Sequence, residues 1–184
     1  MNIYRKIYKY THNKNEYFDY PIEIVKNLYI GSAQSVSDLN LLKSYNIKSI
    51  VNITNGVPNY FPTDFNYYNL RIGDHQSVNI LEYIDYINAF IDGAIKSGGC
   101  IIHCRKGVSR SASFILAYLV YKGVKLIDAW NLLKLKRCIV NPNVGFKNQL
   151  ILYNEYLNGY KDTILINNHF IKYVEYIVIH PTAS

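Results

Sequence analysis

A buried strand, a short loop with a glycine inside it, and a helix follow one another in the middle of the chain. The apolar run at residues 100–102 predicts the strand, and the apolar run at residues 114–121 predicts the helix. The loop between them spans residues 104–110 and contains Gly107. Such a loop at a helix N-terminus can turn successive backbone N–H groups inward, so that they form an anion-binding cup. The stretch therefore predicts an oxyanion site at the junction of a strand and a helix.

Two side chains give this cup a chemistry. Cys104 stands at its entrance, where N–H dipoles and nearby cations favour the thiolate over the thiol. Arg110 closes it with a planar fork that can hold two oxygens of a phosphate group. A thiolate nucleophile and a bidentate arginine in one phosphate-sized nest predict phosphoryl transfer. The alternative interpretation is a buried structural cysteine beside a helix N-terminus.

The pattern His103-Cys104-x-x-Gly107-x-x-Arg110-Ser111 resembles the signature of the cysteine-dependent protein tyrosine phosphatase superfamily. The Ser-Arg-Ser-Ala-Ser segment at residues 109–113 is most similar to the dual-specificity branch. The resemblance covers roughly residues 21–158. It implies an α/β fold, a single domain with a central, mostly parallel sheet of about five strands flanked by helices.

Asp74 is the predicted general acid. It lies on a polar loop before a long helix predicted at residues 80–96, and the resembled family places its acid on a loop of this kind. A carboxylic acid poised above the cup can protonate the leaving oxygen as the P–O bond breaks. The alternative is that Asp74 only caps the following turn. Asp64 comes too early in the loop to compete, and Asp92 lies on the helix.

Further residues are predicted to support the reaction. Ser111 is expected to hydrogen-bond the sulfur and help it leave, and His103 to position the loop and tune the thiolate. The resemblance of residues 141–146 to the family implies that Asn141 braces the loop. The residues predicted to bind substrate are those of the loop itself: Arg105, Lys106, Gly107, Val108, Ser109 and Arg110. For the first two, contact with substrate and exposure to water are equal alternatives.

The predicted reaction has two steps and uses no metal or cofactor. Cys104 takes the phosphoryl group while Asp74 protonates the leaving group, and water activated by Asp74 then hydrolyses the phosphocysteine. Expected partners are phosphorylated proteins, with phosphate or vanadate as small ligands of the site.

The expected substrates include phosphoserine and phosphothreonine as well as phosphotyrosine. This prediction follows because no segment resembles the long tyrosine-recognition loop of phosphotyrosine-only enzymes. The alternatives on the same scaffold are a phosphoinositide phosphatase and an RNA 5′-phosphatase. A third alternative is a phosphoprotein-binding scaffold with little turnover.

The chain as a whole divides into three parts. The sequence predicts an N-terminal arm or helix at residues 1–20, the catalytic domain at residues 21–158, and a C-terminal extension at residues 159–184. In the extension, residues 163–166 and 169–179 predict the two strands of a hairpin joined by a tight turn. The hairpin is expected either to cover the sheet or core, or to meet a partner. The partner is either another protein or a second copy of the chain, and in the latter case the terminal extensions form a homodimer.

Periodicity places the remaining elements of the catalytic domain. The predicted strands are residues 22–25, 28–32, 47–53 and 66–71, and the predicted helices are residues 35–45, 111–122, 124–137 and 144–157. Ser35 is the predicted N-cap of the first of these helices.

Composition limits the partners and the compartment. The net charge of +7 suits acidic partners, phosphorylated substrates among them, without selecting one. No apolar run approaches the ~20 residues that a membrane span requires. The three cysteines follow no disulfide or metal-ligand spacing, and a thiolate nucleophile survives best under reducing conditions. The expected location is therefore intracellular and cytoplasmic, in a host cell or virion if the source is viral.

Overall fold

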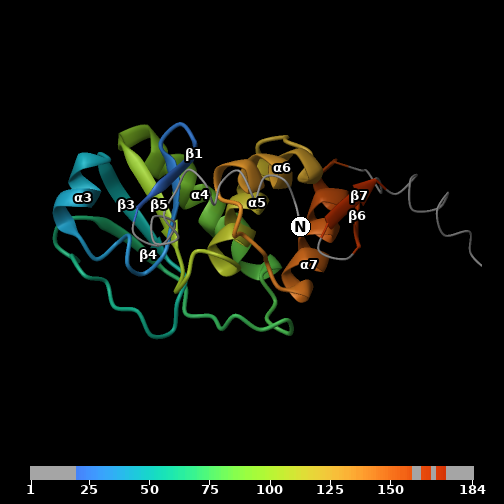
Figure 1. Cartoon of the computed structure of the whole chain (residues 1–184), viewed down its shortest axis with the longest axis horizontal. Coiled ribbons are helices and arrows are strands. Elements are labelled where there is room, and N and C mark those ends of the chain that lie inside the picture. The colour runs from blue at the N-terminus through green and yellow to red at the C-terminus, as the bar shows by residue number, and fades with distance from the viewer. Residues whose placement is uncertain (1–19, 159–162, 167–168, 173–184) are drawn as a thin grey trace, which may run out of the picture.

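The computed structural model describes residues 20–158, 163–166 and 169–172 (Figure 1). The arm or helix predicted at the N-terminus, and most of the C-terminal extension, lie outside the described residues. Within residues 20–158 no helix is both long and apolar enough to cross a membrane.

A five-stranded sheet forms the centre of the fold. Its order is β1-β2-β5-β3-β4, and only the pair β1–β2 is antiparallel. The strands are β1 Ile22–Val25, β2 Leu28–Gly31, β3 Ile47–Asn52, β4 Asn66–Asn69 and β5 Gly99–His103. All residues of β5 are buried, as expected for a central parallel strand covered on both faces. The predicted α/β fold with a mostly parallel sheet is confirmed.

Helices cover the two faces of this sheet unequally. Alternation along β5 sends Cys100 and Ile102 to one core and Ile101 to the other. The larger core is formed with α4 Leu81–Ser97, α5 Arg110–Tyr121, α6 Leu126–Lys136 and α7 Val144–Asn158. The smaller core lies on the opposite face, under the short helix α3 Leu39–Ser44.

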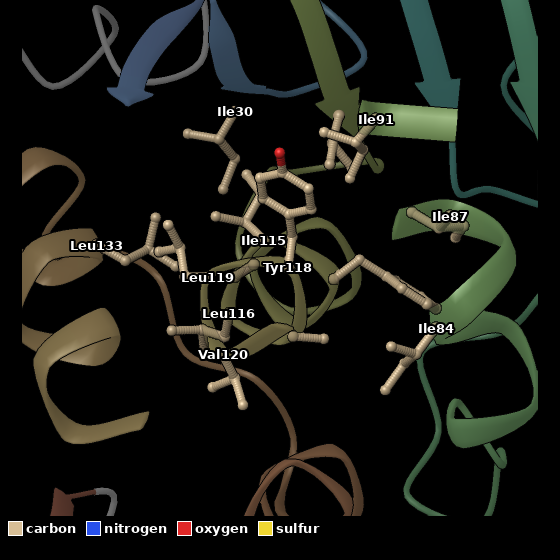
Figure 2. Close-up of a cluster of buried hydrophobic side chains, with 14 of the residues drawn as sticks. Ile30, Ile84, Ile87, Ile91, Ile115, Leu116, Tyr118, Leu119, Val120 and Leu133 are labelled. Atoms are coloured by element: carbon tan, nitrogen blue, oxygen red, sulfur yellow. The ribbon is translucent and has the colours of Figure 1, made fainter. Parts of the chain in front are cut away.

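Helix α5 lies at the middle of the larger core. Every residue from Ser111 to Val120 is buried, so the helix is buried around its whole circumference. Figure 2 shows its side chains, Ile115 and Leu119 among them, between isoleucines of α4 on one side and Leu133 of α6 on the other. The helix that follows the loop of residues 104–110 is therefore fixed by packing on all sides.

Helix α3 begins later than predicted. The periodicity predicted a helix from Ser35, but residues 33–36 form turns and the helix starts at Leu39. Asp38 is its N-cap and accepts hydrogen bonds from Asn40 N (2.9 Å) and Leu41 N (3.0 Å). The Ser35 hydroxyl cannot cap because it is already paired with the backbone of Ser32, accepting from N (2.8 Å) and donating to O (2.9 Å).

The predicted hairpin is present within the described residues. Strands β6 Thr163–Ile166 and β7 His169–Lys172 pair antiparallel, and β6 lies beside α7 while β7 lies beside α6 (Figure 1). The predicted continuation of the second strand to residue 179 lies outside the described residues.

Candidate active site

The loop from Cys104 to Arg110 joins β5 to α5, and its backbone carbonyls point away from its centre. Four successive carbonyl oxygens accept hydrogen bonds from groups outside the loop: Arg105 O from Ala33 N (3.2 Å), Lys106 O from Arg137 Nη2 (3.1 Å), Gly107 O from Arg137 Nε (2.9 Å) and Val108 O from Asn141 N (2.8 Å). The backbone N–H groups of Val108 and Ser111 hydrogen-bond the Cys104 sulfur. The Gly107 N–H lies 3.2 Å from the Cys104 sulfur. The loop is therefore a nest of amides around a sulfur atom.

Arg137 supports this nest from beneath, and sequence reasoning missed it. The side chain is fully buried and bonds two consecutive loop carbonyls, so its guanidinium fixes their direction. The one available signal was a charged residue at the head of the otherwise apolar run at residues 138–140. A buried arginine needs such acceptors, because an uncompensated charge in a protein interior is costly.

At the position of Gly107, neither the surrounding space nor the backbone conformation suits a residue with a side chain. Its φ of +65° lies in the left-handed region that L side chains rarely adopt. A Cβ added there would lie 2.6 Å from Gly31 O and 2.8 Å from Arg137 Nη2. Neither neighbour can move without opening the contacts that shape the nest.

We expect Gly107→Ala to lower the free energy of unfolding by about 1–3 kcal/mol, because it adds backbone strain and overpacks the loop. Gly56→Ala is the matched control, since nothing lies within 4 Å of a Cβ at that position. The control should change stability by no more than about 0.5 kcal/mol, as surface substitutions usually do. Urea unfolding of the two variants measures the difference. Equal losses in both would contradict the proposed fit of the loop.

Cys104 and Cys100 are both buried, yet their surroundings move their pKa values in opposite directions. Burial raises the pKa of Cys100 to about 12, so this thiol stays protonated. Burial also acts to raise the pKa of Cys104. Hydrogen bonds from the Ser111 hydroxyl and the Ser111 and Val108 backbone, together with the Arg110 charge, outweigh burial and lower that pKa below its ordinary value. The surroundings of Cys104 therefore favour its thiolate form, whereas those of Cys100 favour the thiol.

We expect Ser111→Ala to raise the pKa of the Cys104 thiol, because the Ser111 Oγ lies 3.3 Å from the sulfur and favours the thiolate. The rate at which iodoacetamide modifies Cys104 should therefore shift to higher pH, as mass spectrometry of the modified peptide would show. Ser113→Ala is the control, because that hydroxyl donates to Ser109 O (2.9 Å). A profile that moves equally in both variants, or in neither, would remove Ser111 from this role.

Arg110 reaches back over the loop with one side of its guanidinium engaged. Its Nη1 donates to Ile72 O (3.0 Å), which fixes the plane of the group. Its Nε is buried and has no hydrogen-bond partner among the described residues, with Asp74 Oδ2 at 3.8 Å. Buried donors are normally satisfied. An oxygen of a bound phosphate would provide this donor with an acceptor.

His103 ends strand β5 and is buried next to the nest. Burial lowers the pKa of His103 to about 4; a hydrogen bond to the backbone of Cys104 opposes this effect and the charge of Arg110 adds to it. The imidazole is therefore neutral at physiological pH and adds no positive charge beside the sulfur.

Asp74 lies against the loop, while the other two acidic side chains considered are engaged elsewhere. Its Oδ1 accepts from Ser109 Oγ (2.6 Å). Asp64 pairs with Lys43 (3.0 Å), and Asp92 accepts from Tyr118 and Lys122. The structure thus brings Asp74 into contact with Ser109 of the loop and places Asp74 Oδ2 3.8 Å from Arg110 Nε.

The two asparagines at the start of α7 have different contacts. Asn141 meets the loop through its backbone N–H, whereas its side chain accepts from Lys147 Nζ (2.8 Å). Asn143, to which the sequence analysis assigned no role, donates from Nδ2 to Asp74 Oδ1 (3.0 Å). The sequence does not distinguish Asn143 from Asn141, because each of them is a direct neighbour of Pro142.

Helix α7 also holds the segment that carries Asp74. Gln149 accepts from Ile80 N (2.6 Å) and donates to Val78 O (2.9 Å). A Cβ on Gly145 would collide with the backbone of Gln76, so the first turn of α7 packs directly against this segment. Helix α7 therefore fixes the position of the segment that carries Asp74, the candidate acid.

Two predicted loop residues are exposed, and one cavity lies at a distance from the loop. Arg105 and Lys106 have exposed side chains. A cavity of about 390 Å³ opens between α4 and the first residues of β3 and β4, near Lys48 and Phe90, at the opposite end of the sheet from the loop. Within the described part of the chain, no three or more His, Cys, Asp or Glu side chains gather as a metal site would require.

Known proteins share this sequence and this fold. The family described as dual specificity phosphatase, catalytic domain, matches residues 28–156. Human dual specificity protein phosphatase 9 is 38% identical over 136 residues, which are 72% of this chain and 35% of that protein. Mouse protein phosphatase Slingshot homolog 1 is 37% identical over 145 residues, 78% of this chain and 14% of that protein. The chain thus spans about a third or less of the length of these relatives.

Solved structures agree in architecture. The crystal structure of human DUSP28 has a TM-score of 0.72 at 26% identity, and the match covers 75% of this chain and 95% of that one. Human tyrosine phosphatase-like serine/threonine/tyrosine-interacting protein has a TM-score of 0.72 at 31% identity, covering 75% and 97% of the two chains. The family match spans well over half of the chain and includes the loop, Asp74 and most of α7. By its sequence and its fold, this chain belongs to the dual specificity phosphatase family.

Proposed function

We propose that the chain is a phosphoprotein phosphatase that hydrolyses phosphotyrosine and phosphoserine or phosphothreonine through a phosphocysteine on Cys104. One observation carries the proposal. The Cys104 sulfur is held by the Gly107 N–H and the Ser111 hydroxyl, and the buried Nε of Arg110 has no hydrogen-bond partner among the described residues. A stabilised thiolate and a donor directed at an oxyanion are what transfer of a phosphoryl group to sulfur requires.

The reaction follows from the roles of these groups. The thiolate of Cys104 attacks phosphorus while loop N–H groups, among them those of Val108 and Ser109, and Arg110 hold the equatorial oxygens. The P–O bond to the leaving group breaks as Asp74 protonates the leaving oxygen. In the second step Asp74 removes a proton from water, the water oxygen bonds to phosphorus, and the S–P bond breaks. Ser111 stabilises the sulfur that leaves, and neutral His103 and Asn141 support the loop.

The small-ligand and cellular parts of the proposal follow from the same site. Phosphate and vanadate should bind in the loop and compete with substrate, because both are tetrahedral or near-tetrahedral oxyanions. A reducing, cytoplasmic location suits a thiolate that oxidises readily. A homodimer through the terminal extensions would involve residues that lie mostly outside the described ranges.

A comparison of four substrates tests the proposed function. A phosphotyrosine peptide, a phosphothreonine peptide, a phosphoinositide and a 5′-triphosphorylated RNA would be assayed side by side by phosphate release. We expect both peptides to be hydrolysed with the higher kcat/KM values, and EDTA to have no effect. A higher value for the lipid or the RNA would replace the proposed substrate class with that alternative, for which the exposed Arg105 and Lys106 are the candidate contacts. Binding of phosphopeptide without turnover would indicate a scaffold.

A further inference from the structure

We propose that Asn143 and Ser109 are positioning residues for the general acid. Together they hold the carboxyl group of Asp74 by one oxygen, so that the other oxygen presents the proton to the leaving group. This inference rests on the proposed function, in which Asp74 is the acid.

The two oxygens of Asp74 have different surroundings. Oδ1 accepts two hydrogen bonds, from Ser109 Oγ (2.6 Å) and from Asn143 Nδ2 (3.0 Å). Oδ2 lies 3.8 Å from Arg110 Nε. One oxygen is thus used for attachment, and the other lies toward the residue proposed to hold the phosphoryl group.

The directions of both donors are fixed by their other partners. Ser109 Oγ accepts from Asn143 N (3.1 Å), so its own proton is left to point at Asp74. Asn143 Oδ1 accepts from Phe146 N (3.0 Å) at the first turn of α7, so the amide is oriented with Nδ2 toward Asp74. A flipped Asn143 would lose both bonds.

This arrangement assigns the proton. Because Oδ1 already accepts two donors, the neutral acid carries its proton on Oδ2. In the first step the Oδ2–H bond breaks and the proton moves to the leaving oxygen. In the second step Oδ2 takes a proton from the attacking water. The two bonds to Oδ1 persist through both steps and keep the carboxyl group from rotating.

Three segments far apart in sequence meet at this carboxyl group. Ser109 belongs to the loop of residues 104–110, Asn143 precedes α7, and Asp74 follows strand β4. The acid is therefore tied to the loop that holds its reaction partner. A shift of about 1 Å in such a group can reduce a rate by about 10²-fold.

Leaving-group dependence measures this positioning directly. The substrates are aryl phosphates whose phenols range from strongly to weakly acidic, and kcat/KM is measured for each with wild type, Asn143→Ser, Ser109→Ala and Asp74→Asn. Asn143→Ser keeps an oxygen for Phe146 N and loses the donor to Asp74. We expect a loss of about 10- to 100-fold for the poorest leaving groups and little change for the best. Ser109→Ala should slow the poorest leaving groups to the same extent, and Asp74→Asn should slow them more.

Two features keep the result interpretable. The ratio between good and poor leaving groups compares substrates on one preparation, so any unfolded fraction cancels. Asn79→Ser is the matched control, because Asn79 Oδ1 accepts from Leu81 N (3.1 Å) at the first turn of α4, as Asn143 does at α7. That variant should keep the wild-type ratio.

The outcomes separate the two proposals. If Asp74→Asn is leaving-group selective but Asn143→Ser and Ser109→Ala slow all substrates equally, the positioning role is overturned and the proposed function stands. If Asp74→Asn also lacks selectivity, Asp74 is not the acid, and that part of the proposed function fails as well.

Discussion

Replacing Cys104 by serine should reduce turnover of a phosphotyrosine peptide by about 10⁴- to 10⁶-fold, the scale on which enzymes lose activity with their nucleophile. A serine hydroxyl is a much weaker acid than a thiol, whereas hydrogen bonds from the Ser111 hydroxyl and from backbone amides lower the pKa of the Cys104 thiol below its ordinary value. Binding should survive, since the Gly107 N–H and Arg110 remain. Phosphate release measures the first effect, and titration with labelled phosphopeptide measures the second.

Cys138→Ser is the control for this experiment. Cys138 is a half-buried cysteine on the turn after Arg137. Its replacement should leave turnover close to that of wild type. Substantial turnover in Cys104→Ser, or its loss in Cys138→Ser, would show that the nucleophile is elsewhere.

Removing the guanidinium in Arg110→Ala should lower kcat/KM by about 10³-fold or more. Loss of a single oxyanion donor costs about 10²- to 10³-fold, and Arg110 can present two donors to a phosphate group. The buried Nε, which has no hydrogen-bond partner among the described residues, is the donor that a bound oxyanion would satisfy. Vanadate affinity should fall in parallel, because the same donor binds the inhibitor.

Two companion variants separate charge from geometry. Arg110→Lys keeps the positive charge but loses the planar fork, so it should recover only part of the lost activity. Arg105→Ala removes an arginine of the same loop whose side chain is exposed. We expect it to retain most activity toward a small aryl phosphate. If Arg105→Ala is as damaging as Arg110→Ala, the oxyanion is held at the exposed face of the loop.

The loop and its partners differ in how far the sequence could predict them. The strand, the loop and α5 are contiguous, and their chemistry depends on spacing within one stretch, so Cys104, Gly107 and Arg110 could be named in advance. Asp74 could also be named, because the resembled family places its acid on a polar loop before a long helix, and such a loop is visible in the sequence. The sheet and most helices followed from apolar periodicity, since burial decides both.

The residues that hold the loop in place could not be predicted. Arg137 and Asn143 act through loop carbonyls and a distant carboxylate, and no local pattern encodes such pairings. The choice between Asn141 and Asn143 depends on which of them caps α7 and which faces Lys147. The predicted start of α3 was wrong for a similar reason. The Ser35 hydroxyl is paired with the backbone of Ser32, so it cannot cap a helix.

Detection of the phosphorylated enzyme is the most direct test of the central claim. Ser111→Ala should slow departure of the sulfur, so the intermediate accumulates when this variant is mixed with a fast aryl phosphate and quenched within milliseconds. Mass spectrometry of the digested protein should then find phosphate on the peptide that contains Cys104. Phosphate on another residue, or undiminished turnover with no phosphorylated Cys104 at any time, would contradict the account.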